Sequence, residues 1–160
     1  MKSRIEVRVA DLSNEAEANA LVEIIDSYAR GPGGQNAPIS EVARRNMAAG
    51  LLARPHATVL MAFHEGAAVG VAVCVETFST FAGRPAMNLH DLAVLPAHQG
   101  CGIGTALLAE MAQHARQRGC CKLTLEVHEA NTRARALYEQ VGFGPWDQPT
   151  YFVTKPLDAA

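Results

Sequence analysis

Three glycines, Gly100, Gly102 and Gly104, fall within five residues of this chain. They lie between an apolar stretch, "LAVLP", and a run of apolar residues with helical spacing that begins at Ile103. Glycine loses more conformational freedom on folding than any other residue, so glycines this dense indicate a backbone that another group approaches closely. This segment therefore constrains both the fold and the ligand of the chain.

A glycine-rich loop between a strand and a helix points successive N–H groups, and the positive end of the helix dipole, at one spot where phosphate commonly binds. A P-loop is excluded, because Gly104 is followed by Thr105 and Ala106 without a lysine. A dinucleotide fingerprint fits poorly, because Thr105 stands where a third glycine or an alanine is required, although Glu126 lies near the position of a ribose-binding acid. The loop predicts a phosphorylated ligand, and the dinucleotide alternative stays open.

The periodicity and the turn residues predict a single α/β domain over residues 1–160, with a mixed sheet of about six to seven strands and about four helices. Asn14, Ser40 and Asn131 are expected to cap helices, and Gly119 to end one. The expected order is β-α-α-β-β-β-α-β-α-β, with strands in "RIEVRVADL" (4–12), "ATVLMAF" (57–63), "AVGVAVCVE" (68–76), "MNLHDLAVL" (87–95), "KLTLEVH" (122–128) and "TYFVTKPL" (150–157). The strand, helix and strand between residues 88 and 128 require a parallel pair, whereas the early hairpin requires antiparallel pairing.

Composition and charge limit the kinds of partner that this chain is expected to bind. Of the 160 residues 49% are hydrophobic and 19% charged, and the net charge of −2 comes without a basic run, which argues against nucleic-acid binding. The first residues have no apolar core of signal-peptide length, and no apolar window approaches about 18 residues, which predicts a cytoplasmic protein that does not enter a membrane. The four cysteines have no Cys-x-x-Cys spacing, so free thiols and no metal site are expected.

The loop and its surroundings resemble a known family. The run from Gln99 to Gly104, "QGCGIG", matches the pattern Gln/Arg-x-x-Gly-x-Gly/Ala, which is the pyrophosphate loop of the GNAT superfamily of N-acetyltransferases. The lead-in "LAVLPAHQ" and the later segment "LEVHEANTRARALYEQVGF" also resemble that family. Together these motifs extend the resemblance over residues 88–143.

The resemblance implies acetyl-CoA as co-substrate, held between two parallel strands that splay apart. The backbone of Leu92, Ala93 and Val94 would pair with the pantetheine arm, and Asn131 would hydrogen-bond that arm. Tyr138 would lie beside the sulfur. The pyrophosphate would be held by the N–H groups of Gln99, Gly100, Cys101, Gly102, Ile103, Gly104 and Thr105.

Acetyl transfer to an amine needs a base for the ammonium proton and an acid for the leaving thiolate. Tyr138 is the candidate acid, because a phenol has a pKa of about 10; its alternative role is packing in a helix. Glu126 is one candidate base, because it shares a polar strand face with Thr124 and His128; the alternative is a solvated carboxylate. His90 is the other candidate base, with a buried core histidine as its alternative.

The segment "NLHDLAV" also resembles the diamine acetyltransferase branch, whose strand carries Leu-Glu-Asp. Asp91 matches that pattern, but His90 replaces the glutamate, which puts polyamine specificity in doubt. The expected function is transfer of an acetyl group to a primary amine of a small or amino-acid-like acceptor, by direct attack without an acyl-enzyme. A protein amine, a non-catalytic CoA-binding module and a dinucleotide-dependent oxidoreductase remain alternatives, and a homodimer is compatible with the sequence. The acceptor pocket is expected in residues 28–40, 76–85 and 144–150.

Overall fold

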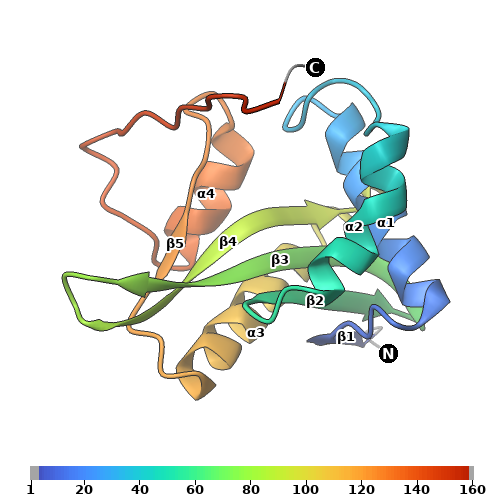
Figure 1. Ribbon diagram of the computed structural model, residues 1–160, viewed down its shortest axis with the longest axis horizontal. Helices are drawn as coiled ribbons and strands as arrows, with labels where there is room; N and C mark the ends of the chain where they lie inside the picture. The colour runs from blue at the N-terminus through green and yellow to red at the C-terminus, as the bar shows by residue number, and fades with distance from the viewer. Residues whose placement is uncertain (1–3, 159–160) are drawn as a thin grey trace. The chain divides into compact units, whose positions relative to one another are not determined.

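The computed structural model describes residues 4–158 (Figure 1). The chain divides into two compact units, one that ends at Leu125 and one that begins at Glu126. The elements are β1 (Ile5–Val9), α1 (Glu15–Arg30), α2 (Glu41–Leu52), β2 (Ala57–His64), β3 (Ala67–Ser79), β4 (Arg84–Val94), the short 3-10 helix η1 (Pro96–His98), α3 (Ile103–Gln117), β5 (Leu123–Leu125) and α4 (Thr132–Gln140). None of the helices within the described range is long and apolar enough to cross a membrane.

The five strands of the first unit form one mixed sheet in the order β1-β2-β3-β4-β5. The first four strands pair antiparallel, and β4 pairs parallel with β5. This confirms the prediction of a mixed sheet with a strand-helix-strand crossover through α3. A dinucleotide-binding fold needs a mostly parallel, doubly wound sheet, so the oxidoreductase alternative is wrong.

Two predicted strands differ from the structure. Residues 150–157 form no strand, and the large apolar side chains of Tyr151, Phe152 and Val153 are exposed. An alternating pattern predicts an extended chain, but it does not reveal whether another strand lies beside it. The strand predicted at residues 122–128 is also shorter, since β5 covers Leu123–Leu125 alone.

Helices α1 and α2 begin directly after the capping residues that the sequence predicts, Asn14 and Ser40. The Asn14 side chain accepts a hydrogen bond from the Glu17 N–H at 3.1 Å, and Ser40 does the same for Ala43 at 3.1 Å. Both caps satisfy a donor that the first turn of a helix leaves unpaired. In α2 the apolar side chains of Val42 and Leu52 are exposed.

Helices α1 and α2 cover one face of the first unit's sheet, and α3 covers the other (Figure 1). Leu21 of α1 packs with Val71 and Val73 of β3 in a buried cluster that Met47 and Leu51 of α2 flank. A Cβ on Gly70 would approach the Ile103 side chain of α3 to 2.9 Å. Because successive strand residues point to opposite faces, this contact places α3 on the face opposite α1. Gly70 is thus a glycine because α3 packs closely against the strand.

The second unit contains α4 and the chain after it. Asn131 caps α4, its side-chain oxygen accepting from the Ala134 N–H at 3.2 Å, as predicted. Near the other end, the buried Tyr138 ring lies edge-on to Phe143, with ring centroids 5.8 Å apart. The Trp146 indole N–H donates to the Phe143 carbonyl at 2.9 Å. Aromatic contacts thus hold the segment that follows α4.

Candidate active site

The glycine loop joins β4 to α3 through η1. Gly100 and Gly102 adopt φ values of +76° and +84°, the left-handed region that side chains disfavour. A Cβ on either glycine would meet nothing within 4 Å. The backbone turn therefore requires these glycines, and the space in front of them is open to a ligand.

The loop presents its donors at the start of α3. The first α-helical bond runs from the Ala106 N–H to the Gly102 carbonyl at 3.0 Å. The N–H groups of Ile103, Gly104 and Thr105 therefore precede the first intrahelical bond, and the glycine cap has no side chain to accept from them. Together with the helix dipole, these donors fit an anion.

Gln99 makes two hydrogen bonds that hold the loop in place. Its backbone N–H donates to the Pro96 carbonyl at 3.3 Å, so that group is already engaged within the turn. Its side-chain amide donates to the Val94 carbonyl at 3.1 Å. Gln99 therefore braces the loop against the end of β4.

The edge of β4 next to the loop is open within the first unit. The parallel ladder with β5 contains three pairs and ends at Leu89 and Leu125. On the other side, β3 pairs with β4 as far as Val94, but the register shifts between Val73 and Cys74, which makes His90 an extra residue in β4. Such a bulge bends and twists a strand, and bulges are frequent beside active sites. No strand among the described residues of the first unit covers the β4 edge beyond Leu89.

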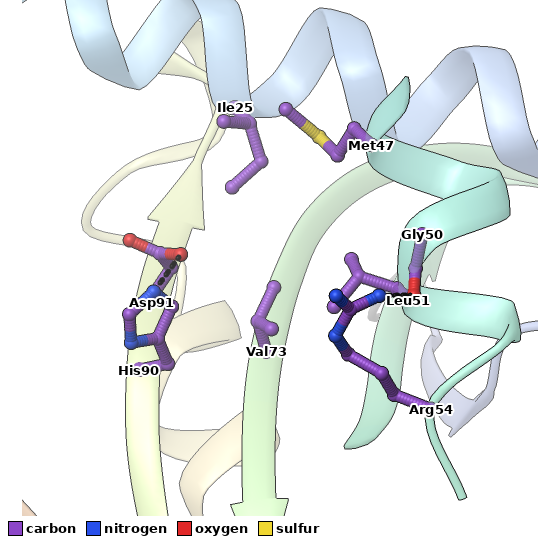
Figure 2. Close-up of a pocket in the computed structure, with 8 residues that line it drawn as sticks. All are labelled: Ile25, Met47, Gly50, Leu51, Arg54, Val73, His90 and Asp91. Carbon is purple, nitrogen blue, oxygen red and sulfur yellow. Dashed lines mark hydrogen bonds and ion pairs between the residues drawn. The ribbon is translucent and has the colours of Figure 1, made fainter. Parts of the chain in front are cut away.

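A cavity of about 290 Å3 lies in the first unit beside this bulge. Its walls come from α1, α2 and the turn after it, β3 and β4, as Figure 2 shows. The lining residues are Ile25, Met47, Gly50, Leu51, Arg54, Val73, His90 and Asp91. None of them belongs to residues 28–40, 76–85 or 144–150, so the predicted lining segments do not form this cavity. Ile25, Val73 and Arg54 carry no motif, and only the packing of separate segments of the chain brings them together.

Asp26 braces the helical wall of the cavity. This buried carboxylate accepts from Arg30 Nε at 2.8 Å and from the Ile39 N–H at 3.0 Å, and it pairs with Arg44 Nη2 at 3.0 Å. The pKa of Asp26 is lowered by the hydrogen bond from Arg30, by the hydrogen bond from the Ile39 N–H and by the charge of Arg44. Burial of the carboxylate acts in the opposite direction. Asp26 thus ties α1 to α2 and to the loop between them.

His90 and Asp91 form the polar side of the cavity. His90 Nε2 lies 3.8 Å from Asp91 Oδ2, and the two side chains are 66% and 35% exposed. The alternative of a buried core histidine is therefore wrong. Burial raises the pKa of Asp91, and the charge of His90 opposes that shift. The segment "NLHDLAV" was the sequence signal for this side of the site.

Replacing Asp91 by asparagine is expected to raise Tm at pH 7. A carboxyl group whose pKa is raised by folding destabilises the native state once the pH exceeds the ordinary value of about 4, because the unfolded chain loses its proton more readily. The Tm advantage of Asp91→Asn should therefore vanish as the pH falls below about 4. Thermal denaturation of both proteins across this pH range tests the prediction. The control is Asp147→Asn, because Asp147 is exposed. An advantage that did not change with pH would contradict the role of desolvation.

The remaining predicted site residues lie in the second unit. Tyr138 is buried beside Phe143, and Asn131 uses its side-chain oxygen to cap α4. Glu126 is exposed and lies beyond the end of β5. In β5 itself, the Thr124 hydroxyl accepts from the Asn88 amide at 3.0 Å. The predicted strand therefore ends before Glu126, and Thr124, which shares the predicted polar face, has a partner in β4. The role of Glu126 as a base stays a prediction. Residues 4–158 contain no group of three potential metal ligands from His, Cys, Asp and Glu.

The family and the three proteins described next are similar to this chain, and all of them are acetyltransferases. The pattern of the acetyltransferase (GNAT) family matches residues 19–143. A ribosomal protein bS18-alanine N-acetyltransferase from Haemophilus influenzae is 35% identical over 88 residues, 55% of this chain and 56% of that protein. A glucosamine 6-phosphate N-acetyltransferase from Trypanosoma brucei brucei is 25% identical over 140 residues, 87% of this chain and 88% of that protein. A ribosomal-protein-alanine N-acetyltransferase crystal structure from Brucella melitensis biovar Abortus 2308 has a TM-score of 0.77 at 24% identity, and the match covers 96% of this chain and 100% of that one.

The mixed sheet and the glycine loop place this chain in the class of acetyltransferase folds. The chain belongs to the GNAT acetyltransferase family, which confirms the resemblance found in the sequence. The likeness to the Brucella structure shows the fold alone, because the identity is below 25%. The chain spans little more than half the length of the Haemophilus relative.

Proposed function

We propose that this protein transfers the acetyl group of acetyl-CoA to the primary amine of a small acceptor. The observation that carries the proposal is the loop at Gly100–Gly102, whose open front and the helix-start N–H groups that follow it lie next to the open edge of β4. The family match supports acetyl-CoA as the phosphorylated ligand of this loop. Because that match includes parts of both units, we also propose that they belong to one functional domain.

The residues present fit acetyl-CoA in two places. The donors of Gly100, Cys101, Gly102, Ile103, Gly104 and Thr105 would hold the pyrophosphate, where a Cβ on Gly100 or Gly102 would occupy the open space. The backbone of Leu92, Ala93 and Val94 offers an edge to which an extended arm can pair as a strand does. Asn131 is proposed to hydrogen-bond the same arm, following the family resemblance.

When bound, acetyl-CoA supplies an acetyl thioester, and its acetyl group passes to the amine as a C–N bond forms and the C–S bond breaks. His90 is proposed to take the ammonium proton, because it lies at the cavity beside Asp91. Glu126 remains the second candidate for this proton. Tyr138 is proposed to give the proton that the sulfur takes up.

The pH profiles of variants are expected to distinguish the two candidate bases, His90 and Glu126. If His90 is the base, His90→Gln should lower kcat by at least about tenfold and abolish the acidic limb of the kcat/KM profile. Glu126→Gln should then leave that limb intact. The reverse pattern would assign the base to Glu126. Near-full activity of both variants would mean that the amine reaches the site already neutral.

The function itself is tested by binding and by turnover. Acetyl-CoA is expected to raise Tm in a concentration-dependent way, while NAD and NADP leave it unchanged. A panel of amines should then release free CoA from acetyl-CoA, with the acetylated amine as the other product. Because the named relatives acetylate acceptors as different as a ribosomal protein and an amino sugar phosphate, the panel should include peptides with free N-termini. Stabilisation by acetyl-CoA without transfer to any amine would favour a non-catalytic CoA-binding module.

A further inference from the structure

The cavity beside the β4 bulge has opposite charges on opposite walls. Figure 2 shows His90 and Asp91 on β4 at one side and Arg54 after α2 at the other, with Val73 between them. All these residues belong to the first unit. The arrangement is therefore a property of one compact part of the chain.

The negative side is a carboxylate that the protein compensates weakly. Asp91 is partly withdrawn from water, and the nearby His90 nitrogen lies at 3.8 Å, beyond hydrogen-bonding distance. Burial raises the pKa of Asp91, in line with a carboxylate that has few partners in this place. A ligand ammonium group at this carboxylate would supply the missing partner.

The middle of the cavity is apolar. Ile25 of α1, Met47 and Leu51 of α2 and Val73 of β3 supply its walls. Its volume of about 290 Å3 equals the liquid volume of about ten water molecules. The middle of the cavity thus suits a short hydrocarbon body rather than a chain of hydroxyl or amide groups.

The positive side is a tethered guanidinium. Arg54 Nη1 donates to the Gly50 carbonyl at 2.6 Å, which holds the side chain against the end of α2. Among residues 4–158 no carboxylate forms an ion pair with Arg54. A guanidinium has five N–H donors, so this tether leaves donors for an anion.

We propose that the acceptor is a zwitterion, in which a short apolar body separates a primary amine from a carboxylate or similar anionic group. The amine lies at Asp91 and His90, and the anion lies at Arg54. The inference rests on the proposed acetyl transfer, because it names the acceptor class of that reaction. Arg54 also acts against diamines, because a second ammonium group would meet a like charge at that end.

Matched acceptors test the charge at each end. One set is ε-aminocaproate, hexylamine and hexamethylenediamine; a shorter set is γ-aminobutyrate, butylamine and putrescine. Turnover is followed as CoA release, and binding is measured by calorimetry with the protein saturated with desulfo-CoA. We expect the aminocarboxylate of at least one set to exceed its alkylamine by about tenfold or more in kcat/KM and in affinity, and the diamine to rank last.

Variants of Arg54 locate the source of the preference. Arg54→Gln should reduce the ratio of aminocarboxylate to alkylamine to about one, and Arg54→Lys should retain most of it. Arg45→Gln, which changes an exposed arginine of α2 that does not line the cavity, should leave the ratio unchanged. Equal use of amines with and without the anion by the wild-type protein, or a preference for diamines, would overturn the inference whether or not the variants fold. Selective binding of the aminocarboxylate without transfer would instead uphold the inference and refute the proposed function.

Discussion

The variant Gly102→Asp is expected to weaken acetyl-CoA binding by about a hundredfold or more, which corresponds to about 2.7 kcal/mol. Gly102 caps α3 at a φ of +84°, and a Cβ there points into open space in front of the loop donors. An aspartate would place a negative charge where the N–H groups and the helix dipole attract phosphate. Calorimetric titration with acetyl-CoA measures the loss directly.

Two controls separate charge from backbone strain. Gly102→Asn adds a similar side chain at the same φ without the charge, and asparagine tolerates that region better than most residues, so we expect a smaller loss of affinity. Gly119→Asp places the same acid at a φ of +75° at the other end of α3, where it should lower Tm without affecting acetyl-CoA binding. Wild-type affinity in a folded Gly102→Asp protein would exclude this loop as the pyrophosphate site.

The variant Tyr138→Phe is expected to lower kcat by about a hundredfold or more, while the Kd for acetyl-CoA changes little. Phenylalanine retains the ring that lies edge-on to Phe143 and removes the hydroxyl group that is proposed to give its proton to the sulfur. Because the ring stays buried, the free energy of unfolding should change by about 1 kcal/mol at most. Steady-state kinetics and equilibrium binding on the same preparation separate the two effects.

Tyr151→Phe is the matched control, since Tyr151 is exposed and lies after α4 in the same unit. It should retain wild-type kcat. A loss for Tyr138→Phe that is confined to KM would leave Tyr138 as a packing residue. If acceptors that are already neutral restored the kcat of Tyr138→Phe, removal of the amine proton, rather than donation of a proton to the sulfur, would limit turnover.

The helix starts and the hairpin turn were predictable because short-range interactions decide them. The Asn14, Ser40 and Asn131 side chains each accept a hydrogen bond from an N–H three residues ahead. Gly66 has a φ of +81° between β2 and β3, as a tight hairpin demands. The glycine loop belongs to the same group, because its strand, turn and helix are consecutive in the chain.

Errors arose where a segment depends on a distant partner. Residues 150–157 have the pattern of a strand but form none, and the polar residues after Leu125 had been assigned to a strand face that does not extend to them. The register shift at His90 also depends on a distant partner, and the sequence did not predict it. It depends on how β3 and β4 pair along their whole length, and no local pattern encodes it.

By itself the sequence determined the family and the glycine loop, because motifs and local hydrogen bonds reside in consecutive residues. It named Tyr138, Glu126 and His90 as candidates for moving a proton, and these roles stay predictions. The tertiary structure alone decided that His90 and Asp91 line a cavity and that Arg54 lies on its opposite wall. Those residues come from strands and helices far apart in the chain. Their approach follows from burying Leu21, Val71 and Val73 in one core, a collective packing that no single segment specifies.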